Sequence, residues 1–465
     1  MTLNPADPAF EAALRADLSP DVFRAVEPRY LEEPRGLYAG KSAVLALPRT
    51  VEEVAILIRH ANAARVGVIP YGGGTGLVGG QVAETGPAPL ILSLERMNKL
   101  RAVYPDENVL VAEAGMILSD VQDAAEAADR LFPLTLAAQG SARIGGNLAT
   151  NAGGTGVLRY GNARDLCLGL EAVLPDGQIW NGLTRLRKNN TGYDLRHLLV
   201  GAEGTLGVIT AAALKLFPRP AKTGTALLVV NSPAAALKLL SLARSQLGEM
   251  ISAFEIMNGV GLDFLTEKMP ELRQPFESPP EWSVLIELGL SGDLEPMAAL
   301  ETLFAAAFEA ELVTDGLIAQ SQQQSEDFWA VREMMPHANR QIGSISSHDI
   351  SVPLGALPDF IIRAGEKIGA LGDFRINCFG HVGDGNFHCG LRVDPGDADE
   401  VARIHRFTAA LAENALRLGG TVTGEHGVGV GKIAYMSAEH GAAVAVMRSL
   451  KSALDPKGIL NPGKM

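Results

Sequence analysis

Apolar residues recur at helical and strand spacings along the first half of the chain. Thr50 begins a capping-box pattern before residues 54–64, whose periodic apolar positions predict an amphipathic helix. Ser119 begins a similar pattern and predicts a second capped helix. Short apolar runs between glycine, proline and polar residues predict buried strands. These strands are expected at residues 66–71, 90–94 and 108–115, and on both sides of the Pro-Asp-Gly turn at 175–177.

The composition changes near Pro218–Pro220, and a second alternating pattern continues to about residue 420. The apolar run at 225–231 predicts a strand. A helix is predicted directly after it, with Ser232 as its cap and Pro233 in its first turn. Further strands and helices alternate in the same way. This pattern predicts a second domain of the α+β class, with limits near residues 220 and 420.

The composition narrows the class of protein. The chain has 465 residues, 47% of them hydrophobic, which predicts two or three folded domains. Its net charge of −13 argues against a general nucleic-acid surface. Three cysteines without a CxxC pair predict a reducing compartment. The N-terminal segment lacks the pattern of a signal peptide, so a cytoplasmic protein is expected, and peripheral contact with the inner membrane stays open.

Glycine is concentrated in three segments, at residues 72–80, 140–156 and 200–207. In the first segment, Gly74 to Gly79 match the GxGxxG pattern of a dinucleotide-binding turn. That motif requires a helix that begins in the loop, whereas two prolines and little helical periodicity follow here. Each segment alone is explained by tight turns. Together they favour one large phosphorylated cofactor, because the backbone N–H groups of glycines can approach a phosphate closely.

Five segments resemble, in the same order, those of FAD-dependent D-2-hydroxyacid dehydrogenases. They are YGGGTGLVGG, GSARIGGNLATNAGG, LRKNNTGYDLRHLLVGAEGTLGVIT, GHVGDGNFH and GEHGVG. These enzymes belong to the vanillyl-alcohol oxidase / p-cresol methylhydroxylase flavoprotein superfamily, and LRKNNTGYDLR is most similar to the D-2-hydroxyglutarate dehydrogenase branch. The resemblance extends from about residue 40 to the C-terminus. It implies an α+β fold, with an FAD-binding domain of the vanillyl-alcohol oxidase type in two parts, residues 1–220 and 421–465. An α+β substrate-capping domain with an antiparallel sheet is expected at 221–420.

The same resemblance assigns residues to FAD. The pyrophosphate would be held by Pro70, Tyr71, Gly72, Gly73, Gly74, Thr75, Gly76, Gly79 and Gly80. The flavin and its phosphate would be lined by Gly140, Ser141, Gly145, Gly146, Asn147, Thr150 and Gly153. The cradle would be completed by Glu203, Gly204, Ile209 and, from the C-terminal tail, Asn461. Some members of the superfamily attach FAD covalently through a histidine in the first loop. Residues 71–80 contain neither histidine nor cysteine, so noncovalent FAD is expected.

His381 and His388 flank a glycine-rich turn at residues 382–386. On one straight strand, two residues seven positions apart point to opposite faces. The turn formers between them predict a hairpin, which would make the histidines cross-strand neighbours about 5 Å apart. Two imidazoles at that spacing can bind one metal ion. The alternative is that both histidines form hydrogen bonds within a buried hairpin.

The family resemblance implies the remaining parts of the site. Glu425 corresponds to a divalent-metal carboxylate and His426 to the catalytic base, while Arg332 corresponds to the arginine that binds the substrate carboxylate. Asn386 and Lys432 are further candidates for substrate binding, with a turn-forming role and a surface position as their alternatives. Zinc is the expected metal, and Mn2+ or Fe2+ are alternatives. The implied reaction transfers a proton to His426 and a hydride to flavin N5.

The chain departs from the hydroxyglutarate branch at two positions. That branch has a threonine four residues after the arginine, and a lysine two residues before the aspartate of its DxSxP motif; this chain has Pro336 and Ser347 there. The missing lysine weakens the case for a second substrate carboxylate, and His348 or Arg340 are the candidate replacements. D-2-hydroxyglutarate or D-malate is favoured as substrate. D-lactate and glycolate remain the alternatives.

Three functions are compatible with these motifs. The favoured one is a metal-dependent dehydrogenase that passes electrons to a quinone, an electron-transfer flavoprotein or a cytochrome. The second is an oxidase of the same family that uses oxygen. The third is a non-catalytic FAD-binding subunit of an oxidase complex, and the intact His381, His388, Glu425 and His426 argue against it. A homodimer is a further expectation.

Overall fold

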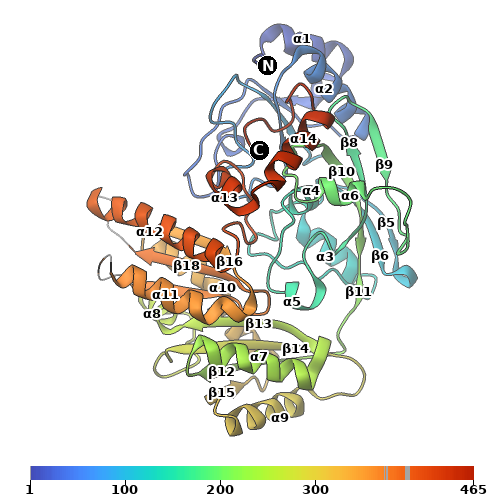
Figure 1. Ribbon diagram of the computed structural model, residues 1–465. Helices are drawn as coiled ribbons and strands as arrows, with labels where there is room; N and C mark the ends of the chain where they lie inside the picture. Colours follow the sequence, from blue (N-terminus) through green and yellow to red (C-terminus); the bar gives the residue numbers. More distant parts are fainter. Residues whose placement is uncertain (1, 371, 373–374, 393–397) are drawn as a thin grey trace. The chain divides into compact units, whose positions relative to one another are not determined.

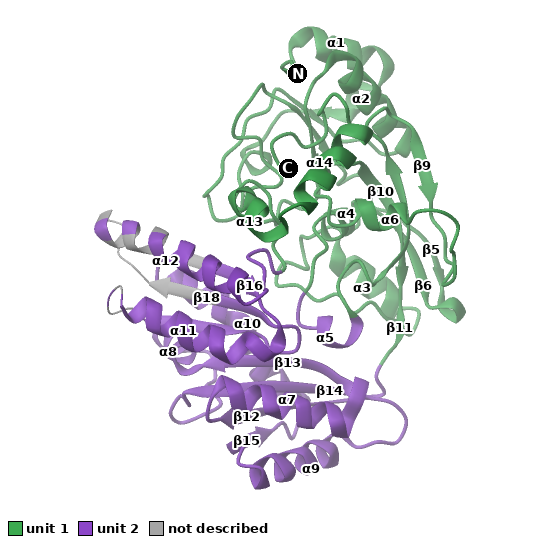
Figure 2. Ribbon diagram, in the orientation of Figure 1, with its two compact units in different colours: residues 1–153, 161–219, 425–465 green, residues 154–160, 220–424 purple. Residues whose placement is uncertain are grey.

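The computed structural model describes residues 2–370, 372, 375–392 and 398–465, and the side chain of Ser347 lies outside its described part. The chain forms two compact units, shown in separate colours in Figure 2. Unit 1 comprises Met1–Gly153, Gly161–Arg219 and Glu425–Met465, whereas unit 2 comprises Gly154–Tyr160 and Pro220–Gly424. Unit 1 is therefore built from both ends of the chain.

Unit 1 contains a five-stranded antiparallel sheet in the order β5-β6-β10-β8-β9 (Figure 1). Its strands are β5 (Leu100–Tyr104), β6 (Val109–Glu113), β8 (Cys167–Val173), β9 (Ile179–Gly182) and β10 (Val208–Lys215). The three inner strands are buried at nearly every residue. Both faces of the sheet centre are therefore covered, which explains the continuous apolar runs in the sequence.

A second sheet in unit 1 has the order β1-β2-β4-β3. Its strands are β1 (Phe23–Arg24), β2 (Val44–Ala46), β3 (Val68–Tyr71) and β4 (Leu90–Ser93), and a separate pair joins β7 (Arg130–Leu131) to β11 (Phe217–Pro218). Strands β2 and β3 run parallel to β4. Because β3 ends at Tyr71, this sheet holds the start of the first glycine-rich segment.

Two helices of unit 1 were predicted to begin at capping residues, Thr50 and Ser119. The helices of unit 1 are α1 (Pro8–Asp17), α2 (Val51–Ala64), α3 (Leu118–Glu126), α4 (Ile144–Ala149), α6 (Leu195–Leu199), α13 (Met436–His440) and α14 (Ala443–Leu454), with 3-10 turns at Pro20–Val22, Pro28–Tyr30, Pro105–Glu107 and Ile433–Tyr435. The Thr50 cap is confirmed, because its side chain accepts the N–H of Glu53. The Ser119 cap is wrong: Ile117 precedes the helix and gives no side-chain cap. Ile117 bridges to Arg143, so a tertiary contact determines where α3 begins.

Unit 2 is built on a seven-stranded antiparallel sheet in the order β15-β12-β14-β13-β17-β18-β16. Its strands are β12 (Lys222–Val230), β13 (Ile251–Asn258), β14 (Trp282–Leu290), β15 (Val313–Ile318), β16 (Ser344–Ser351), β17 (Ile376–His381) and β18 (Asn386–Arg392). The predicted α+β fold with an antiparallel sheet is confirmed.

Helices cover both faces of this sheet. They are α5 (Val157–Tyr160), α7 (Pro233–Leu247), α8 (Gly259–Lys268), α9 (Pro296–Glu309), α10 (Gln322–Gln341), α11 (Leu357–Gly369) and α12 (Ala398–Arg417), with 3-10 turns at Gly248–Met250 and Leu354–Ala356. The predicted Ser232 cap of α7 is confirmed by its bond from the N–H of Ala235. Helices α7, α9, α11 and α12 share one core with the sheet, and α8 and α10 share another.

Alternate side chains of β13 point to opposite faces of the sheet, so they belong to different cores of unit 2. On β13, Phe254 and Ile256 belong to the core with α7 and α11, whereas Met257 belongs to the core with α8 and α10. Glu255 therefore lies on the α8–α10 face. Across the described residues, no helix has the length and apolar content needed to cross a membrane.

Candidate functional site

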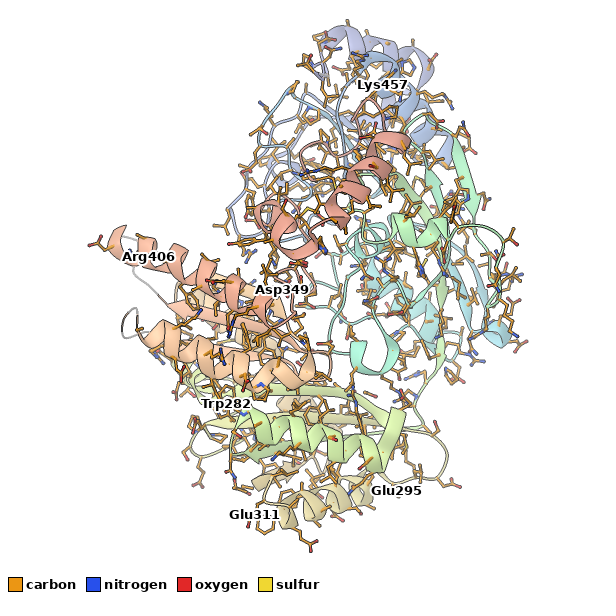
Figure 3. All side chains as sticks on the ribbon, viewed as in Figure 1. Trp282, Glu295, Glu311, Asp349, Arg406 and Lys457 are labelled. Carbon is orange, nitrogen blue, oxygen red and sulfur yellow. The ribbon has the colours of Figure 1, made fainter. Side chains whose placement is uncertain are left out.

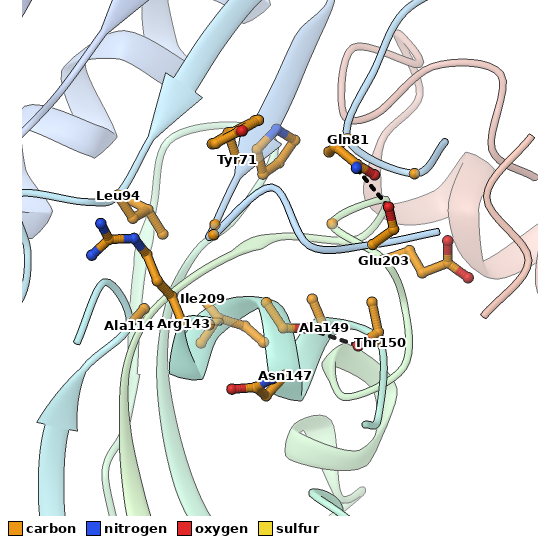
Figure 4. A pocket seen from close by; sticks show the side chains of 18 of the residues that line it. Tyr71, Gln81, Leu94, Ala114, Arg143, Asn147, Ala149, Thr150, Glu203 and Ile209 are labelled. Carbon is orange, nitrogen blue, oxygen red and sulfur yellow. Dashed lines mark hydrogen bonds between the residues drawn. The ribbon is translucent and has the colours of Figure 1, made fainter. Parts of the chain in front are cut away.

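A cavity lined by residues of unit 1 is shown in Figure 4. Its wall contains most of the residues assigned to FAD from the sequence: Pro70, Tyr71, Gly72, Gly73, Gly74, Thr75, Gly76, Gly80, Gly145, Gly146, Asn147, Thr150, Glu203, Gly204, Ile209 and Asn461. The structure also describes Gly79, Gly140, Ser141 and Gly153, but these four lie outside the wall. Segments from four separate parts of the chain thus converge on one cavity.

The wall also includes residues that the motifs did not indicate. Among them are Gln81, Leu94, Ala114, Arg143, Ala149, Gly207 and Val208. His426, expected to be the catalytic base, lines the same cavity. The β-strand and loop residues in this set carry no local signal of cofactor binding, because only the fold brings them together. Arg143 directly precedes α4, where its side chain carries positive charge to the cavity wall.

The backbone of the first glycine-rich segment packs directly against the backbone of Ser141. A Cβ atom at Gly73 would lie 2.2 Å from the carbonyl oxygen of Ser141, which no side chain could tolerate. The next residue, Gly74, has a φ of +72°, a conformation that glycine adopts at little cost. Glycine is therefore required here by close approach and by backbone conformation. Ser141 supports the loop in this way although it lies outside the cavity wall.

The cavity fits a ligand rich in hydrogen-bonding groups. A Cβ atom at Gly146 would meet no protein atom within 4 Å, so the space in front of this wall residue is open. The side-chain oxygens of Asn147 and Asn461 are buried and accept no hydrogen bond from the described residues. Both asparagines line the cavity. Buried polar atoms normally have partners, so donors on a bound ligand are the expected partners, and FAD has such donors on its flavin and ribityl groups.

The C-terminal tail closes this cradle. The side-chain amide of Asn461 donates to the carbonyl oxygens of Gly80 at 3.0 Å and Glu203 at 2.6 Å. The Glu203 carboxylate in turn accepts the N–H groups of Val428 at 2.7 Å and Gly429 at 2.8 Å. Burial raises the pKa of Glu203, and these two hydrogen bonds oppose the rise. The loop that carries Glu425 and His426 is thereby fastened to the cofactor cradle within unit 1.

In unit 2, the predicted histidine hairpin is formed by β17 and β18, and it makes His381 and His388 cross-strand neighbours as expected. His381 pairs with Asn386, and His388 pairs with Phe379. A four-residue turn joins the strands, because β17 ends at His381 and β18 begins at Asn386. The histidines are diagonal neighbours on one face, with ring centroids 5.8 Å apart and possible ligand nitrogens within 4.8 Å.

A buried carboxylate that the motifs did not indicate lies beside this pair. Glu255, on β13, is 1% exposed. Its Oε1 atom lies 2.7 Å from Nδ1 of His381, and its Oε2 atom accepts a hydrogen bond from Nε of Arg332 at 2.9 Å and forms an ion-pair contact with Nη2 at 2.7 Å. Burial would raise the pKa of Glu255, but the charges and hydrogen bonds of His381 and Arg332 lower it to about 2. The sequence signal was a single charged residue within the apolar strand AFEIM, since a buried charge needs a partner.

Arg332 is held on the histidine face of the sheet. It lies on α10, is 6% exposed, and its guanidinium stacks over the ring of Phe379 at 4.8 Å. Pro336 lies one turn later within the same helix and has no N–H to donate to the Arg332 carbonyl. The helix nevertheless continues to Gln341. The arginine predicted to bind substrate is therefore ordered by an ion pair and by an aromatic ring.

Asn386 offers a ligand an acceptor. Its amide group donates to Oδ1 of Asp349 at 2.8 Å and to the Ser351 hydroxyl at 3.1 Å, while its own side-chain oxygen is buried with no partner among the described residues. Asp349, labelled in Figure 3, is 2% exposed and is the register partner of His388. A carboxylate requires donors, so Asn386 in this arrangement suits a substrate hydroxyl or a water better than a carboxylate.

The two candidate replacement cations lie on different sides of the unit 2 sheet. Nε2 of His348 is 3.0 Å from the hydroxyl of Thr408, and its ring packs edge-to-face against Phe407. Phe407 belongs to the core on the α7–α11–α12 side, so His348 faces away from Arg332 and the histidine pair. Arg340 is exposed near the end of α10 and lies 3.3 Å from Nδ1 of His337. The structure thus does not bring His348 to the predicted substrate face.

The remaining predicted residues lie in the unit 1 loop that Glu203 fastens. Nε2 of His426 is 3.8 Å from Oε1 of Glu425, and both side chains are partly exposed. Lys432 ends this loop, and its backbone N–H donates to the carbonyl of Val428. A carboxylate and an imidazole are thus adjacent at the edge of the cavity.

Two family models match the chain. "FAD binding domain" matches residues 42–182, and "FAD linked oxidases, C-terminal domain" matches residues 219–465. The chain is 37% identical over 434 residues to "Probable D-2-hydroxyglutarate dehydrogenase, mitochondrial" of Oryza sativa subsp. indica, covering 92% of this chain and 76% of that protein. It is 38% identical over 425 residues to a D-2-hydroxyglutarate dehydrogenase of Xanthomonas citri pv. viticola, covering 90% of this chain and 88% of that protein.

Solved structures share the fold at low sequence identity. p-Cresol methylhydroxylase with substrate bound superimposes with a TM-score of 0.77 at 16% identity, covering 100% of this chain and 98% of that one. An alkyldihydroxyacetonephosphate synthase gives a TM-score of 0.74 at 19% identity, covering 100% of this chain and 86% of that one. At this identity the likeness concerns the fold alone.

The open space at Gly146 leads to a test of the cradle. We expect Gly146→Val to remove bound cofactor without unfolding unit 1, because the new side chain would extend into the cavity and meets no protein atom at its Cβ. The measurement is the ratio of visible flavin absorbance to protein absorbance, together with circular dichroism. Gly365→Val, at an exposed position on α11 with no atom within 4 Å, is the control and should keep its flavin. Full flavin content in a folded Gly146→Val protein would show that the cofactor lies elsewhere.

Proposed function

Because the chain belongs to the FAD-linked oxidases of the vanillyl-alcohol oxidase / p-cresol methylhydroxylase superfamily and is an FAD-dependent D-2-hydroxyacid dehydrogenase, we propose that it oxidises D-2-hydroxyglutarate with the help of a divalent metal. The relatives named above support the choice of substrate. The observation that carries the proposal is the arrangement on one face of the unit 2 sheet, where an arginine lies beside two imidazoles. One arginine and two imidazoles suit a ligand in which a carboxylate lies next to a hydroxyl group, as in a 2-hydroxyacid.

His381 and His388 are proposed to supply two metal ligands, and Glu425 the third. Gly424, the last residue of unit 2, donates its N–H to the carbonyl of Asp349, which is the register partner of His388. Glu425 follows Gly424 directly, so its Cα stays about 3.8 Å from that of Gly424. Chain connectivity therefore supports Glu425 as a ligand. Two imidazoles and one carboxylate, with a position left for substrate, are typical of catalytic zinc, which makes Zn2+ the proposed metal.

Arg332 is proposed to bind the C1 carboxylate of the substrate. Glu255 occupies Nε and one edge of Nη2, which leaves the other guanidinium N–H groups to donate to a second carboxylate. An arginine fixed in this way binds a carboxylate with two parallel hydrogen bonds and therefore orients it. The neighbouring C2 hydroxyl then points toward the histidine pair.

Oxidation at C2 removes the hydroxyl proton and a hydride. A bound divalent metal lowers the pKa of a coordinated hydroxyl, and FAD, when bound, accepts the hydride. His426 is proposed to take the proton at Nε2, the ring nitrogen that lies 3.8 Å from Oε1 of Glu425. A neutral imidazole has a lone pair on one ring nitrogen, so it can accept a proton. The Glu203 hydrogen bonds keep the loop of His426 at the cofactor cavity.

Removal of one proposed ligand tests the metal. We expect His388→Ala to lose bound metal and to lower kcat/KM by roughly 100-fold or more, while it keeps its FAD, because the cavity wall belongs to unit 1. Elemental analysis and visible absorbance of the same sample measure both cofactors. His440→Ala, which changes an exposed histidine at the end of α13, is the control and should change neither. An unchanged metal content in folded His388→Ala protein would make His388 structural.

Substrate size needs a separate test. We expect a higher kcat/KM for D-2-hydroxyglutarate than for D-lactate, and Arg340→Ala should lower the diacid value selectively. The loss of a charge-assisted contact costs about 1.5–3 kcal/mol, or roughly one to two decades in kcat/KM. His348→Ala is the comparison and should have no selective effect, since its ring faces the other core.

The departures at Pro336 and Ser347 favour the alternative, a D-lactate or glycolate dehydrogenase. Preference for D-lactate in the unmodified enzyme would overturn the diacid assignment. If Arg340→Ala and His348→Ala affect both substrates equally, Arg340 does not bind the second carboxylate.

A further inference from the structure

The two oxygens of Glu255 serve two different functional groups. Oε1 faces Nδ1 of His381, and Oε2 accepts a hydrogen bond from Nε of Arg332 and forms an ion pair with its Nη2. The arrangement is almost dry: the side chain of Glu255 is 1% exposed, that of Arg332 is 7% and that of His381 is 8%. The partners are 77 and 126 residues away in the sequence, so the contacts exist only in the folded unit.

We infer that Glu255 is a positioning residue that sets the tautomer of His381 and the orientation of Arg332, an inference that rests on the metal site of the proposed function. One buried carboxylate thereby links the ligand that would hold the metal to the cation that would hold the substrate. Loss of this carboxylate should weaken both binding events at once.

The tautomer follows from the chemistry of the two groups. An ionised carboxylate only accepts hydrogen bonds, so the ring nitrogen that faces it at 2.7 Å must carry the proton. In neutral imidazole the other nitrogen then has the lone pair. His381 is thus prepared to bind a metal through Nε2. Carboxylates behind metal-binding histidines act in this way in many metal sites.

The orientation of Arg332 follows from the second oxygen. An arginine side chain has several rotatable bonds, and the hydrogen bond from Nε to Oε2, together with the ion-pair contact of Nη2 with the same oxygen, holds the plane of its guanidinium. The ring of Phe379 supports that plane at 4.8 Å. Phe379 is also the register partner of His388, so the ring that supports Arg332 lies on the same hairpin as both histidines.

A contribution to the stability of the fold does not by itself explain why Glu255, Arg332 and His381 are buried together. Taking a carboxylate and a guanidinium out of water costs several kcal/mol per ion, and buried ion pairs often add little net stability. The surrounding core consists of apolar residues such as Met257, Val331 and Met335, which would pack as well against an apolar side chain. The cluster is better explained if Glu255 positions His381 and Arg332 for their proposed roles in the site.

Glu255→Gln separates these roles in the FAD-loaded enzyme. The side-chain amide of glutamine has an acceptor oxygen on one side and a donor NH2 group on the other. If the oxygen faces Arg332, the NH2 group faces Nδ1 of His381. The imidazole proton would then move to Nε2 and block metal binding. We expect Zn2+ affinity to fall by about 10–100-fold in competition with a chelator. The KM for D-2-hydroxyglutarate should rise, and the flavin content should stay unchanged.

Two further variants keep the test decisive. Glu287→Gln changes a partly buried glutamate on β14, on the same face of the sheet, whose carboxylate accepts Nε1 of Trp329 at 2.7 Å. It should leave Zn2+ affinity unchanged. Glu255→Asp keeps the charge but withdraws the carboxylate from both partners. It should therefore weaken Zn2+ binding even if Glu255→Gln does not fold.

The outcomes separate this inference from the proposed function. If the unmodified enzyme binds Zn2+ and the folded Glu255 variants bind it equally well, Glu255 is merely structural and the inference is wrong. If Glu287→Gln weakens Zn2+ binding as much, the effect is not specific to Glu255. If the unmodified enzyme binds no divalent metal, both the metal site and this inference are overturned.

Discussion

The buried carboxylate of Glu255 is the constraint on which the arginine–histidine cluster of unit 2 depends. A carboxylate removed from water must find cationic or donor partners, and here the partners are Arg332 and His381. Strands β13 and β17 and helix α10 must therefore pack so that three residues distant in sequence meet on one face. The histidine pair and the arginine then have fixed positions before any ligand arrives, which reduces the cost of ordering them on binding.

The cofactor side depends on a different constraint, which is close approach of the backbone. Gly73 can pack against the carbonyl of Ser141 only because it has no side chain. Asn461 and Glu203 then join the first loop, the C-terminal tail and the loop of His426 through hydrogen bonds to backbone groups. Unit 1 thus uses both ends of the chain to surround one cavity.

Local features of this fold were predictable from the sequence, and long-range ones were not. The caps at Thr50 and Ser232 were predicted because their hydrogen bonds span three residues. The hairpin that brings His381 and His388 together was predicted from the composition of its turn, whereas its register follows from pairing along the whole of β17 and β18. Glu255 was missed because its partners are far away in the sequence. The cofactor loops were identified through family resemblance, since glycine alone indicates only a turn.

The central claim is that substrate oxidation requires the histidine-bound metal as well as the flavin. The most direct test is anaerobic addition of D-2-hydroxyglutarate to FAD-loaded enzyme, first depleted of metal and then reloaded with Zn2+, while the visible flavin absorbance is recorded. We predict rapid bleaching with the metal and bleaching at least about 100-fold slower without it. Equal bleaching rates in the two samples would contradict the claim.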